Sequence, residues 1–577
     1  MELAVCGDGP AVEAIVAATE DIDAPTRRVE PEAFKTDPDS LPAAGAVVAP
    51  TGSALFEAAT DHLDRWVAVE IGGIGGSPIE TIDAAVTTFG PETACYRCLS
   101  QRVRAHEGST GDDSGDDPRG DRGRVRLAGA VAGHRLLSLL AGAIDGGEIT
   151  ELPGPDRRLL PVPNCTCAAA EEPSRELPLT HRSVGVDDAL RRAEQAVDDR
   201  VGLVTNVGER ESFPVPYYIA EIADTTGFSD TAAADFAAGV DIDWDRAYMK
   251  AIGEAVERYS AGVYRTEQAS RGSAQTVAAP VLPREFVRPE GFETPASDDR
   301  IGWIDGRRLP DGERVSLPAE FVWFPPPCQR FRPAITTGLG LGNSPVGAIL
   351  AGLYEVIERD ATMLAWYSTF DPLGLVIEDD PVITELTKRA RAESLTVTTL
   401  LVTQDIDVPV VAAAVHRKSG WPRFAVGSAA GLDPIAATRS ATAEALQNWM
   451  ELRTMGPEMA AEQSGAIADY ADLPAAAQEF IEPDAQVSAG DLGEPELTGT
   501  EELTAVCDRV SAVDLDAYAA RLTTRDVASL GFEAVRVVIP AAQPLFTGEP
   551  YFGERARSVP ESMGFAPRLD RSYHPYP

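Results

Sequence analysis

The sequence predicts a protein of the α/β class with more than one domain, and three observations support this prediction. The chain has 577 residues, whereas a single hydrophobic core rarely serves more than about 300 residues. Near the amino terminus, a strand-like run at residues 2–6 is followed by a helix-like run at residues 11–20, and further strand-like runs follow. Later in the chain, two helical stretches with apolar residues around most of their circumference flank a β-rich region, which indicates helices buried on most sides.

The most informative stretch is residues 336–361, because it places charged groups on a helix that has almost no polar face. A buried carboxylate without a partner is costly, so it is normally protonated, paired or bound to a cation. The E-x-x-E-R motif at residues 355–359 also occurs at residues 254–258, an offset of 355 − 254 = 101 residues. Two such helices converging on one cavity predict a polyanionic metal cage.

A glycine-rich run at residues 336–342 leads into the central helix, with Asn343 or Ser344 as its natural cap. The run lacks the Gly-Lys-Ser/Thr ending of a P-loop, so metal ions and arginines would have to supply the charge for binding phosphate. A third helix, expected over residues 435–453, carries the sequence E-x-x-Q at residues 444–447. This motif has the same spacing with one carboxylate replaced by an amide.

The charge balance excludes some classes of function. The chain has 91 acidic and 50 basic residues, a formal net charge of −41, and only four of the basic residues are lysines. Such a composition resembles that of proteins from salt-in halophiles, in which salt screens the self-repulsion. A basic binding partner is the alternative, but the even spread of acidic residues favours halophily. The sequence has no stripe of basic residues of the kind that binds nucleic acid. Without an apolar run of spanning length or a secretory leader, we expect a soluble cytoplasmic protein.

Four of the seven cysteines form two close pairs, Cys95 with Cys98 and Cys165 with Cys167. Two paired thiols brought together would make a closed tetrahedral four-cysteine site for Zn²⁺, which is a structural type of site. A reduced cluster without metal is the alternative, and the spacing alone does not decide between them.

The pattern along the chain predicts a first domain at residues 1–170, a polar linker at 171–182 and a second domain at 183–577. The first strand ends in a Gly7-Asp8-Gly9 turn that resembles half of a dinucleotide fingerprint, but valine occupies the third glycine position. A strand, turn and helix without a nucleotide is therefore favoured. Residues 104–124 are acidic, glycine-rich and of low complexity, which predicts a disordered loop.

Together, the three acidic motifs resemble the YcaO superfamily, whose ATP site is built from E-x-x-E-R, G-N-(S/T)…E-x-x-E-R-D and E-x-x-Q helices. The resemblance covers about residues 183–577 and implies an ATP-binding α/β domain of the YcaO type. It also implies that ATP and Mg²⁺ are bound by Glu254, Glu257, Arg258, Asn343, Glu355, Glu358, Arg359, Glu444 and Gln447. Oxygen-rich sites of this kind suit Mg²⁺. The two arginines are placed either to bind phosphate or to pair with the glutamates, and both roles stay open.

Both ends of the chain add to the resemblance. The ending His574-Pro575-Tyr576-Pro577 is similar to the proline-rich carboxyl terminus of azoline-forming members, which reaches into the active site and implies catalytic roles for Pro575 and Pro577. Residues 1–170, above all the segment at 90–102, resemble the small ThiF-like, Rossmann-like α/β partner domain of thiazole/oxazole cyclodehydratases. The fusion of both domains resembles SagD-like peptide maturases, here of a haloarchaeal type.

Some positions depart from the family pattern. Lys250 stands where a serine is usual, Gly347 stands where a glutamate would join the metal and nucleotide contacts, and Asn448 with Trp449 replace an arginine. These departures leave a non-catalytic scaffold open as an alternative. In that case the carboxylate helices would be retained without full turnover of ATP.

The resemblance implies an enzyme that uses ATP to activate a peptide backbone amide. A nucleophile adds to the carbonyl group, the oxyanion is phosphorylated and phosphate leaves; a Cys, Ser or Thr side chain as the nucleophile would give an azoline. The fused first domain and the proline-ended tail favour this outcome. Thioamidation, or an accessory role in methylthiolation, is the alternative and would need a sulfur-delivering partner. We expect the first domain to be too short for a leader-binding element, and therefore expect a separate leader-recognition protein. A homodimer stays open.

Overall fold

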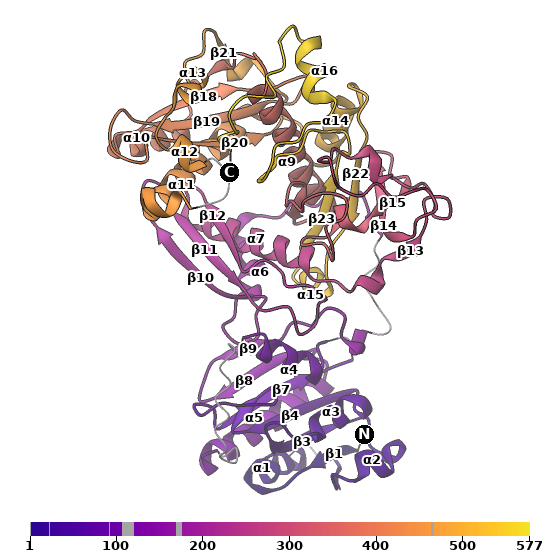
Figure 1. Cartoon of the computed structure of the whole chain (residues 1–577). Coiled ribbons are helices and arrows are strands. Elements are labelled where there is room, and N and C mark those ends of the chain that lie inside the picture. The colour runs from indigo at the N-terminus through magenta and orange to yellow at the C-terminus, as the bar shows by residue number, and fades with distance from the viewer. Residues whose placement is uncertain are drawn as a thin grey trace. The chain divides into compact units, whose positions relative to one another are not determined.

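The computed structural model describes residues 2–21, 24–91, 93–106, 120–168, 176–462 and 467–576. These residues form helices and strands throughout, and the predicted α/β class is confirmed (Figure 1). The chain divides into two compact units. Unit 1 comprises Met1–Glu172, Gln195–Asn206 and Ala223–Ser229, and unit 2 comprises Pro173–Glu194, Val207–Ile222 and Asp230–Pro577.

Two sequence predictions fall wholly or partly outside the described residues. Most of the expected acidic loop at 104–124 lies outside them, because residues 107–119 are not described, and so does most of the first half of the linker at 171–182. Among the residues that are described, no helix is both long and apolar enough to cross a lipid bilayer.

Unit 1 is built on a seven-stranded sheet in the order β2-β1-β3-β4-β7-β8-β9. The first four strands pair in parallel, whereas β7, β8 and β9 join by antiparallel pairing. The strands are β1 (Leu3–Cys6), β2 (Thr26–Val29), β3 (Ala44–Pro50), β4 (Arg65–Ile71), β7 (Ala84–Phe89), β8 (Glu148–Leu152) and β9 (Asp156–Arg158), with the separate pair β5 (Gly73–Ile74) and β6 (Ser77–Pro78).

Two helices of unit 1, α1 and α5, pack against each other on the same side of this sheet (Figure 1). The helices of this unit are α1 (Gly9–Glu20), α2 (Ala33–Thr36), α3 (Leu55–His62), α4 (Tyr96–Arg104) and α5 (Arg122–Leu140). The glycine turn between β1 and α1 is explained by packing alone. Gly7 has a φ of +109°, and a Cβ atom there would lie 2.2 Å from the carbonyl oxygen of Val48.

Unit 2 contains strands of three sheets, with the orders β10-β11-β12, β13-β14-β22-β23-β16 with β15 beside β14, and β20-β19-β18-β17-β21. The strands of the first two are β10 (Val204–Glu211), β11 (Tyr217–Ile222), β12 (Phe236–Val240), β13 (Ser270–Gly272), β14 (Ile301–Leu309), β15 (Arg314–Pro318), β16 (Leu339–Gly342), β22 (Ala517–Arg521) and β23 (Glu533–Val538). Those of the third are β17 (Leu373–Val376), β18 (Thr396–Leu401), β19 (Val410–His416), β20 (Phe424–Ala430) and β21 (Gln486–Ser488).

The three helices expected to carry the acidic motifs all form, as α7, α9 and α11. The helices of unit 2 are α6 (Val186–Ala193), α7 (Trp244–Gly262), α8 (Ala319–Val322), α9 (Pro345–Trp366), α10 (Pro381–Ala392), α11 (Pro434–Ala460), α12 (Ile467–Tyr470), α13 (Ala475–Phe480), α14 (Gly499–Ser511), α15 (Arg525–Ser529) and α16 (Arg555–Ser562). Helix α11 is longer than expected and bends at Gly456, whose φ is +75°.

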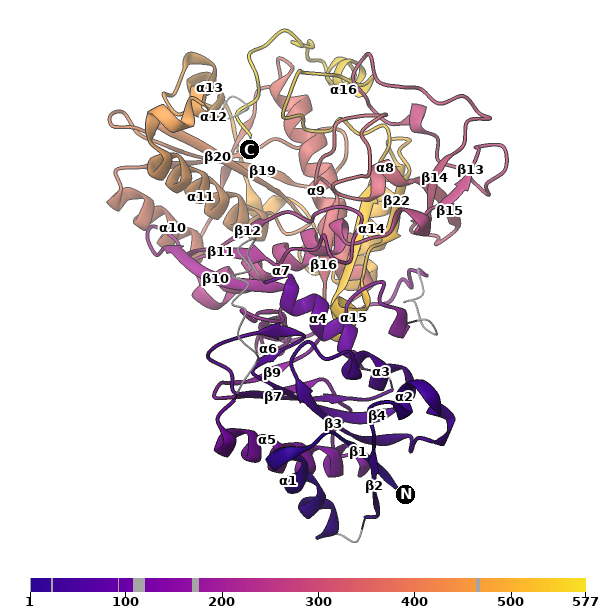
Figure 2. The same ribbon diagram turned by 60° about the horizontal axis from the view of Figure 1, so that its bottom comes forward.

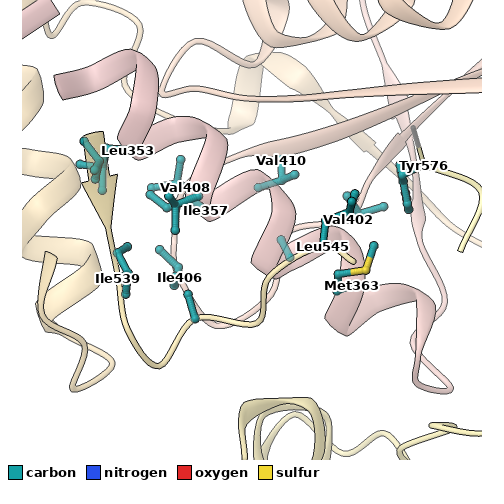
Figure 3. Close-up of a cluster of buried hydrophobic side chains, with 14 of the residues drawn as sticks. Leu353, Ile357, Met363, Val402, Ile406, Val408, Val410, Ile539, Leu545 and Tyr576 are labelled. Carbon is teal, nitrogen blue, oxygen red and sulfur yellow. The ribbon is translucent and has the colours of Figure 1, made fainter. Parts of the chain in front are cut away.

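Helix α9 lies between two sheets of unit 2. Figures 1 and 2 show it between β22 and β23, drawn in gold, and the orange strands β19 and β20, and it packs against β16, β23, β19 and β20. Its apolar side chains, among them Leu353 and Ile357, belong to a core cluster that also contains Val410 and Ile539 (Figure 3). The helix is therefore buried on most sides, as its sequence predicts.

Candidate functional site

The first glutamate of each acidic motif accepts a hydrogen bond from a backbone N–H in a neighbouring strand or, for Glu355, from the residue just before one. The three donor and acceptor pairs are Ala238 N to Glu254 at 2.9 Å, Gly338 N to Glu355 at 2.9 Å, and Ser428 N to Glu444 at 2.8 Å. The pairs are 16, 17 and 16 residues apart in sequence. The site is thus assembled from three copies of one local arrangement, a strand whose backbone N–H fixes the carboxylate of the next long helix.

Glycines in these strands let the helices come close enough for this bond. A Cβ atom on Gly239 would lie 2.3 Å from the carbonyl oxygen of Ala247, and one on Gly340 would lie 2.2 Å from that of Ala348. Both carbonyls lie seven residues before the first glutamate of their motif, since 254 − 247 = 7 and 355 − 348 = 7. Gly427 is in similarly close contact with α11. No side chain fits at these positions, so the glycine-rich run before α9 is explained by close packing.

Glu355 lies at the centre of the acidic cluster. Its carboxylate is among the causes that raise the pKa of each of the four other acidic motif residues, Glu254, Glu257, Glu358 and Glu444. For all four groups burial is the largest cause. Burial, with repulsion from Glu355 next, raises the pKa of Glu257 to about 8. Burial, with repulsion from Glu358 next, raises the pKa of Glu444 to about 7. Helices α7, α9 and α11 therefore bring their carboxyl groups within electrostatic reach of one another.

The carboxylates do not crowd around a single point. Within the described part of the chain, the one group of at least three Cys, His, Asp or Glu ligand atoms within 4.8 Å of one another is a cysteine cluster. A looser arrangement suits Mg²⁺, which binds proteins through one or two carboxylates and completes its shell with waters and substrate phosphates. The residues present therefore fit this metal with a phosphate ligand better than a closed protein cage.

The two arginines differ in their contacts, although they occupy equivalent positions of the E-x-x-E-R motif. Arg258 pairs with Glu254 and donates to the carbonyl oxygen of Phe236 at 2.7 Å, so it is engaged within its own motif. Arg359 makes a longer contact, 3.7 Å from its Nε to Oε1 of Glu358, and its Nη1 is buried without a hydrogen-bond partner among the described residues. Arg359 therefore has donor capacity left for a ligand.

Asn343 has a similar unused group. Its side-chain Oδ1 is buried and has no hydrogen-bond partner in the described part of the protein, whereas its backbone oxygen accepts from Arg182 at 2.8 Å. The neighbouring Ser344 is the N-cap of α9 and accepts from Gly347 N at 3.3 Å. Of the two cap candidates, Ser344 caps the helix, and the Asn343 side chain stays free for a ligand.

Gln447, predicted to complete the site on α11, donates to Glu451 at 3.0 Å. The same Glu451 oxygen also accepts from the Tyr217 hydroxyl at 2.7 Å. Lys250 on α7 pairs with Asp241 at 2.7 Å, so its charge is already compensated.

The last residues return to α9. Trp366 on this helix donates to the backbone oxygen of Ser572 at 2.9 Å, and the Tyr573 hydroxyl and a His574 ring nitrogen lie 2.5 and 2.8 Å from the backbone oxygen of Phe546. These contacts hold the tail against the core of unit 2.

Tyr576 is buried at the end of this tail, with 3 % of its surface exposed, and lies beside Val402 in Figure 3. Burial raises the pKa of its hydroxyl, and the carboxylates of Glu358 and Glu444 raise it further, so the tail reaches the acidic cluster. The hydroxyl has no hydrogen-bond partner among the described residues. Pro575 is buried beside it, whereas Pro577 lies outside the described residues.

The sequence of this chain matches a known protein family. The sequence profile of the family described as "YcaO cyclodehydratase, ATP- and Mg2+-binding" matches residues 238–543, more than half of the 577 residues. The chain belongs to the YcaO family. All three strand and helix copies of the site fall within the matched residues, from Ala238 in the first copy to Gln447 in the last.

Two relatives of this YcaO chain are themselves described as uncharacterized. A protein of Methanothermobacter thermautotrophicus is 28 % identical over 400 residues, covering 64 % of this chain and 98 % of the relative. A protein from the tfuA 3′ region of Rhizobium leguminosarum bv. trifolii is 27 % identical over 238 residues, covering 36 % and 54 %.

Solved structures show the same fold over both units. A structure described as a heterocyclase in complex with substrate and cofactor has a TM-score of 0.74 at 18 % identity, covering 98 % of this chain and 83 % of its own. The heterocyclase TruD has a TM-score of 0.65 at 18 % identity, covering 98 % and 82 %. The YcaO protein of Methanopyrus kandleri, described as bound with AMPPCP and Mg²⁺, has a TM-score of 0.50 at 24 % identity, covering 63 % and 92 %.

The predicted cysteine pairs of this YcaO chain come together in unit 1. The Sγ of Cys95 lies 3.8 Å from that of Cys98 and 3.7 Å from that of Cys165, and Cys98 lies 3.6 Å from Cys167. All four sulfur atoms lie within 4.8 Å of one another. Tetrahedral Zn–S distances of about 2.3 Å place sulfur atoms about 3.8 Å apart, so this arrangement fits Zn²⁺.

Two parts of the YcaO site were missed by sequence reasoning. Ser428 supplies the amide for Glu444, and its hydroxyl donates to Glu358 at 2.7 Å. Asp360, which follows the second E-x-x-E-R motif, is buried and holds both the backbone N–H of Gln543 at 2.7 Å and the guanidinium of Arg555 at 2.7 Å. Asp360 is the last residue of the E-x-x-E-R-D pattern, but no local pattern reveals the partners of Ser428 or Asp360, because these partners come from distant parts of the chain.

Proposed function

We propose that this YcaO chain is an ATP-dependent enzyme that activates backbone amides of a peptide or protein. Its most favoured product is an azoline, formed from Cys, Ser or Thr in a ribosomally made peptide. The observation that carries the proposal is the convergence of five glutamates, of which Glu358 is buried and the others are half-buried, beside two buried polar groups without partners among the described residues, Nη1 of Arg359 and Oδ1 of Asn343. Carboxylates that raise one another's pKa indicate a site built to hold cations.

The residues present fit a nucleotide and Mg²⁺. The carboxylates of α7, α9 and α11 would hold the metal, and Arg359 with Asn343 would bind phosphate and ribose or base atoms. When bound, Mg²⁺ would offset charge on the phosphates and so favour phosphoryl transfer. Arg258 has a supporting role in this proposal, since it positions Glu254. Gln447 would bind through its amide oxygen, because its amide nitrogen is used by Glu451.

The proposed reaction proceeds in three steps. A side-chain thiol or hydroxyl of the substrate gives up its proton and adds to the preceding backbone carbonyl, which closes the ring. The oxyanion then takes the terminal phosphoryl group of ATP and ADP is released. Finally phosphate leaves and the amide nitrogen loses its proton, which forms the C=N bond of the azoline. Stabilising charge on the transferring phosphoryl group is the protein's main contribution to such chemistry.

Two observations favour azoline formation over the alternatives. The heterocyclase folds cover 98 % of this chain, so both units have counterparts in them. The tail with Pro575 and Tyr576 is buried close to Glu358, which supports a catalytic role for the chain's last residues, Pro575 and Pro577. Thioamidation, with a sulfur-delivering partner, is the second candidate, since the same activation of an amide by ATP serves both products. A non-catalytic scaffold is the third.

The rest of the chain takes supporting roles in the proposal. Residues 1–170 form a ThiF-like partner domain with a structural zinc site, residues 171–182 a linker, and residues 183–577 the YcaO domain, as in SagD-like maturases. The carboxylate-rich composition suits a halophilic cytoplasm. A separate protein would supply leader recognition, and a homodimer is compatible with this arrangement.

The first experiment is ATP hydrolysis with Mg²⁺ in high salt, comparing the wild type with Glu355→Gln. We expect the variant to lose at least ~100-fold in rate, because it removes the carboxylate that faces all the others. Glu458→Gln, at an exposed position of the same protein, is the matched control and should leave the rate unchanged. Full activity of the Glu355 variant, or no turnover by the wild type with any peptide of a Cys/Ser/Thr-rich panel, would refute the catalytic proposal.

Mass spectrometry of the treated peptide then separates the two products. An azoline lacks one water relative to the substrate, whereas a thioamide has one oxygen replaced by sulfur and appears only when a sulfur source is present.

A further inference from the structure

Arg332 has no acidic partner among the described residues, although the chain has 91 acidic and 50 basic residues. Within the described part of the protein it makes no hydrogen bond or ion pair. Its guanidinium carbon lies 4.7 Å from the ring centre of Phe321 and 5.8 Å from that of Phe286. Burial lowers its pKa, as expected for a cation removed from water without a counter-charge. Such an arrangement is costly unless an anion binds there.

The side chain of Arg332 lines a small cavity together with Arg359. The cavity has a volume of about 30 Å³, and its other walls include Val356 of α9, Thr337 and the segment at 537–544. Arg359 also has an unpartnered buried Nη1. Since a site for one water needs roughly 10–15 Å³ on the same measure, this cavity admits one or two oxygen atoms of a larger group and not a whole nucleotide.

A third arginine, Arg536, lies within electrostatic reach of Arg332 and of the acidic cluster. Arg536 donates to the backbone oxygens of Thr336 and Ile335, each at 2.9 Å. Its pKa is lowered to about 9, first by burial and then by repulsion from Arg332, while Glu355 acts in the opposite direction. Arg536 therefore brings positive charge within electrostatic reach of both Arg332 and Glu355.

We infer that Arg332 is a further ligand-binding residue of this site, which together with Arg359 binds oxygens of a phosphoryl group. The group is the terminal phosphate of the nucleotide before transfer and the free phosphate afterwards. A guanidinium fork matches two phosphate oxygens, and a transferring phosphoryl group spreads its charge over three oxygens. One side of the group would then face the carboxylate-bound cation and the other the arginines. The nucleotide part of this inference rests on the proposed function, whereas binding of inorganic phosphate does not.

A carboxylate of the peptide is a weaker candidate for the same position. It offers only two oxygen atoms, whereas a phosphoryl group offers three, so the phosphoryl group can contact both arginines and still share an oxygen with the carboxylate-bound cation. Phosphate oxygens are the anionic ligands that Mg²⁺ and arginine accept together.

The neighbouring Arg330 provides a matched control. Its guanidinium also stacks on an aromatic ring, 4.8 Å from the centre of Phe331, but it is paired with Glu320. Replacing either arginine by methionine removes one positive charge and keeps an apolar stem over the ring. A difference between Arg332→Met and Arg330→Met therefore reports the unpaired charge and not the loss of stacking.

The test is calorimetric titration of the full-length protein with inorganic phosphate, with ADP and with the non-hydrolysable analogue AMPPCP, each with Mg²⁺. Arg332→Met should weaken binding of phosphate and of AMPPCP by ~10-fold or more, the value of a charge-assisted hydrogen bond. Binding of ADP should stay unchanged, as should all three affinities in Arg330→Met. Arg332→Lys should restore part of the phosphate affinity, because lysine returns the positive charge but not the planar pair of donors with which a guanidinium contacts two phosphate oxygens.

The outcomes separate this inference from the proposed function. If the wild type binds AMPPCP and Arg332→Met binds AMPPCP and phosphate equally well, the inference fails and the proposed function stands. If the wild type binds phosphate through Arg332 but no nucleotide, the proposed function fails and the anion site stands. Weakened peptide binding with unchanged phosphate binding would assign the position to a carboxylate and overturn the inference. Should Arg332→Met not fold, Arg332→Gln removes the same charge and gives the same comparison.

Discussion

The hydroxyl of Ser428 donates a hydrogen bond to Oε1 of Glu358 at 2.7 Å, and both residues are buried. The backbone N–H of the same serine donates to Glu444 at 2.8 Å. One residue of β20 therefore orients carboxylates from two different helices, α9 and α11. It also lowers the pKa of Glu358 against the effect of burial, which favours the ionised form that binds a cation.

Replacing Ser428 by alanine should weaken binding of Mg²⁺ with nucleotide by several-fold. The hydroxyl would no longer favour the ionised form of Glu358, while the backbone bond to Glu444 would remain. We expect the free energy of unfolding to fall by about 1 kcal/mol, the usual net value of one hydrogen bond. Titration calorimetry measures the first effect and denaturant unfolding the second. Thr442→Val is the control, because the Thr442 hydroxyl donates only to the backbone of its own helix; equal affinities for both variants would contradict the role of Ser428.

The acidic cluster should make stability fall as pH rises when no cation is bound. The pKa of Glu257 is about 8 in the folded protein against 4.5 ordinarily, so between these values the folded state holds a proton that the unfolded state has lost. Stability then decreases with rising pH across this window, and Glu444, with a pKa of about 7, adds to the effect. His574 acts oppositely below pH 6.5, because burial lowers its pKa to about 4.

Denaturant unfolding above pH 6.5, with and without Mg²⁺ and nucleotide, measures this dependence. The bound cation favours ionised carboxylates, so it should flatten or reverse the slope, and its affinity should rise with pH. In Glu257→Gln the slope without cation should be smaller. A slope that is unaffected by both the substitution and the cation would show that the acidic cluster does not titrate as described.

The helices of the site could be predicted from sequence, but the backbone donors that hold their glutamates and the role of Arg332 could not. E-x-x-E-R in an apolar helix is a local pattern, and so are a C-x-x-C pair and a serine or asparagine before a helix. The strand amides that hold Glu254, Glu355 and Glu444 are invisible in sequence, because any residue can donate its backbone N–H. Arg332 looks like any other arginine until the absence of a partner is seen in three dimensions.

The glycines of the site should differ sharply in tolerance. Alanine at Gly340 would place its Cβ 2.2 Å from a backbone oxygen of α9, so Gly340→Ala should displace the helix and abolish binding of Mg²⁺ with nucleotide. At Gly347 the nearest atoms are 3.4 Å or more away, so Gly347→Ala should fold normally. The two variants make the same chemical change, one in β16 and one in the first turn of α9. Thermal unfolding and binding calorimetry distinguish them.

Glutamate at Gly347 should raise stability. The position is the third residue of α9 after its cap Ser344, so Gly347→Glu creates a capping box and adds negative charge at the helix amino terminus. We expect a gain of about 0.5–1 kcal/mol in the free energy of unfolding. If this third site carboxylate on α9, besides Glu355 and Glu358, also contacts the metal, the affinity for Mg²⁺ should rise in parallel. A rise in stability with unchanged affinity would limit the residue to capping.

The cysteine cluster should bind one zinc ion per chain and stabilise unit 1. Elemental analysis of the purified protein gives the stoichiometry, and a strong chelator should lower the unfolding temperature of unit 1. Cys98→Ser, at the sulfur that lies near both Cys95 and Cys167, should lose the metal. Cys507→Ser is the control, since Cys507 is buried in the core of unit 2. Zinc-free protein with unchanged stability would leave a reduced thiol cluster as the explanation.

Removing the last three residues, Pro575 to Pro577, should separate binding from catalysis. The anchors of the tail at Trp366, Tyr573 and His574 would remain, so the shortened protein should fold. Nucleotide affinity should change little, because the carboxylates and Arg359 are intact. The rate of peptide modification should fall by ~100-fold or more, the cost of misplacing groups at the reacting centre.

Tyr576→Phe refines this test of the tail. It removes only the hydroxyl, which is buried near Glu358 without a partner among the described residues. If the hydroxyl contacts the substrate, the variant should lose activity while its stability stays the same or rises, since an unpaired buried hydroxyl contributes nothing to the folded state. If the tail serves only to fill the core, Tyr576→Phe should behave as the wild type, and the deletion should lower nucleotide affinity and activity together through a loss of stability. Parallel measurements of unfolding temperature, nucleotide affinity and modification rate decide between a catalytic tail and a structural one.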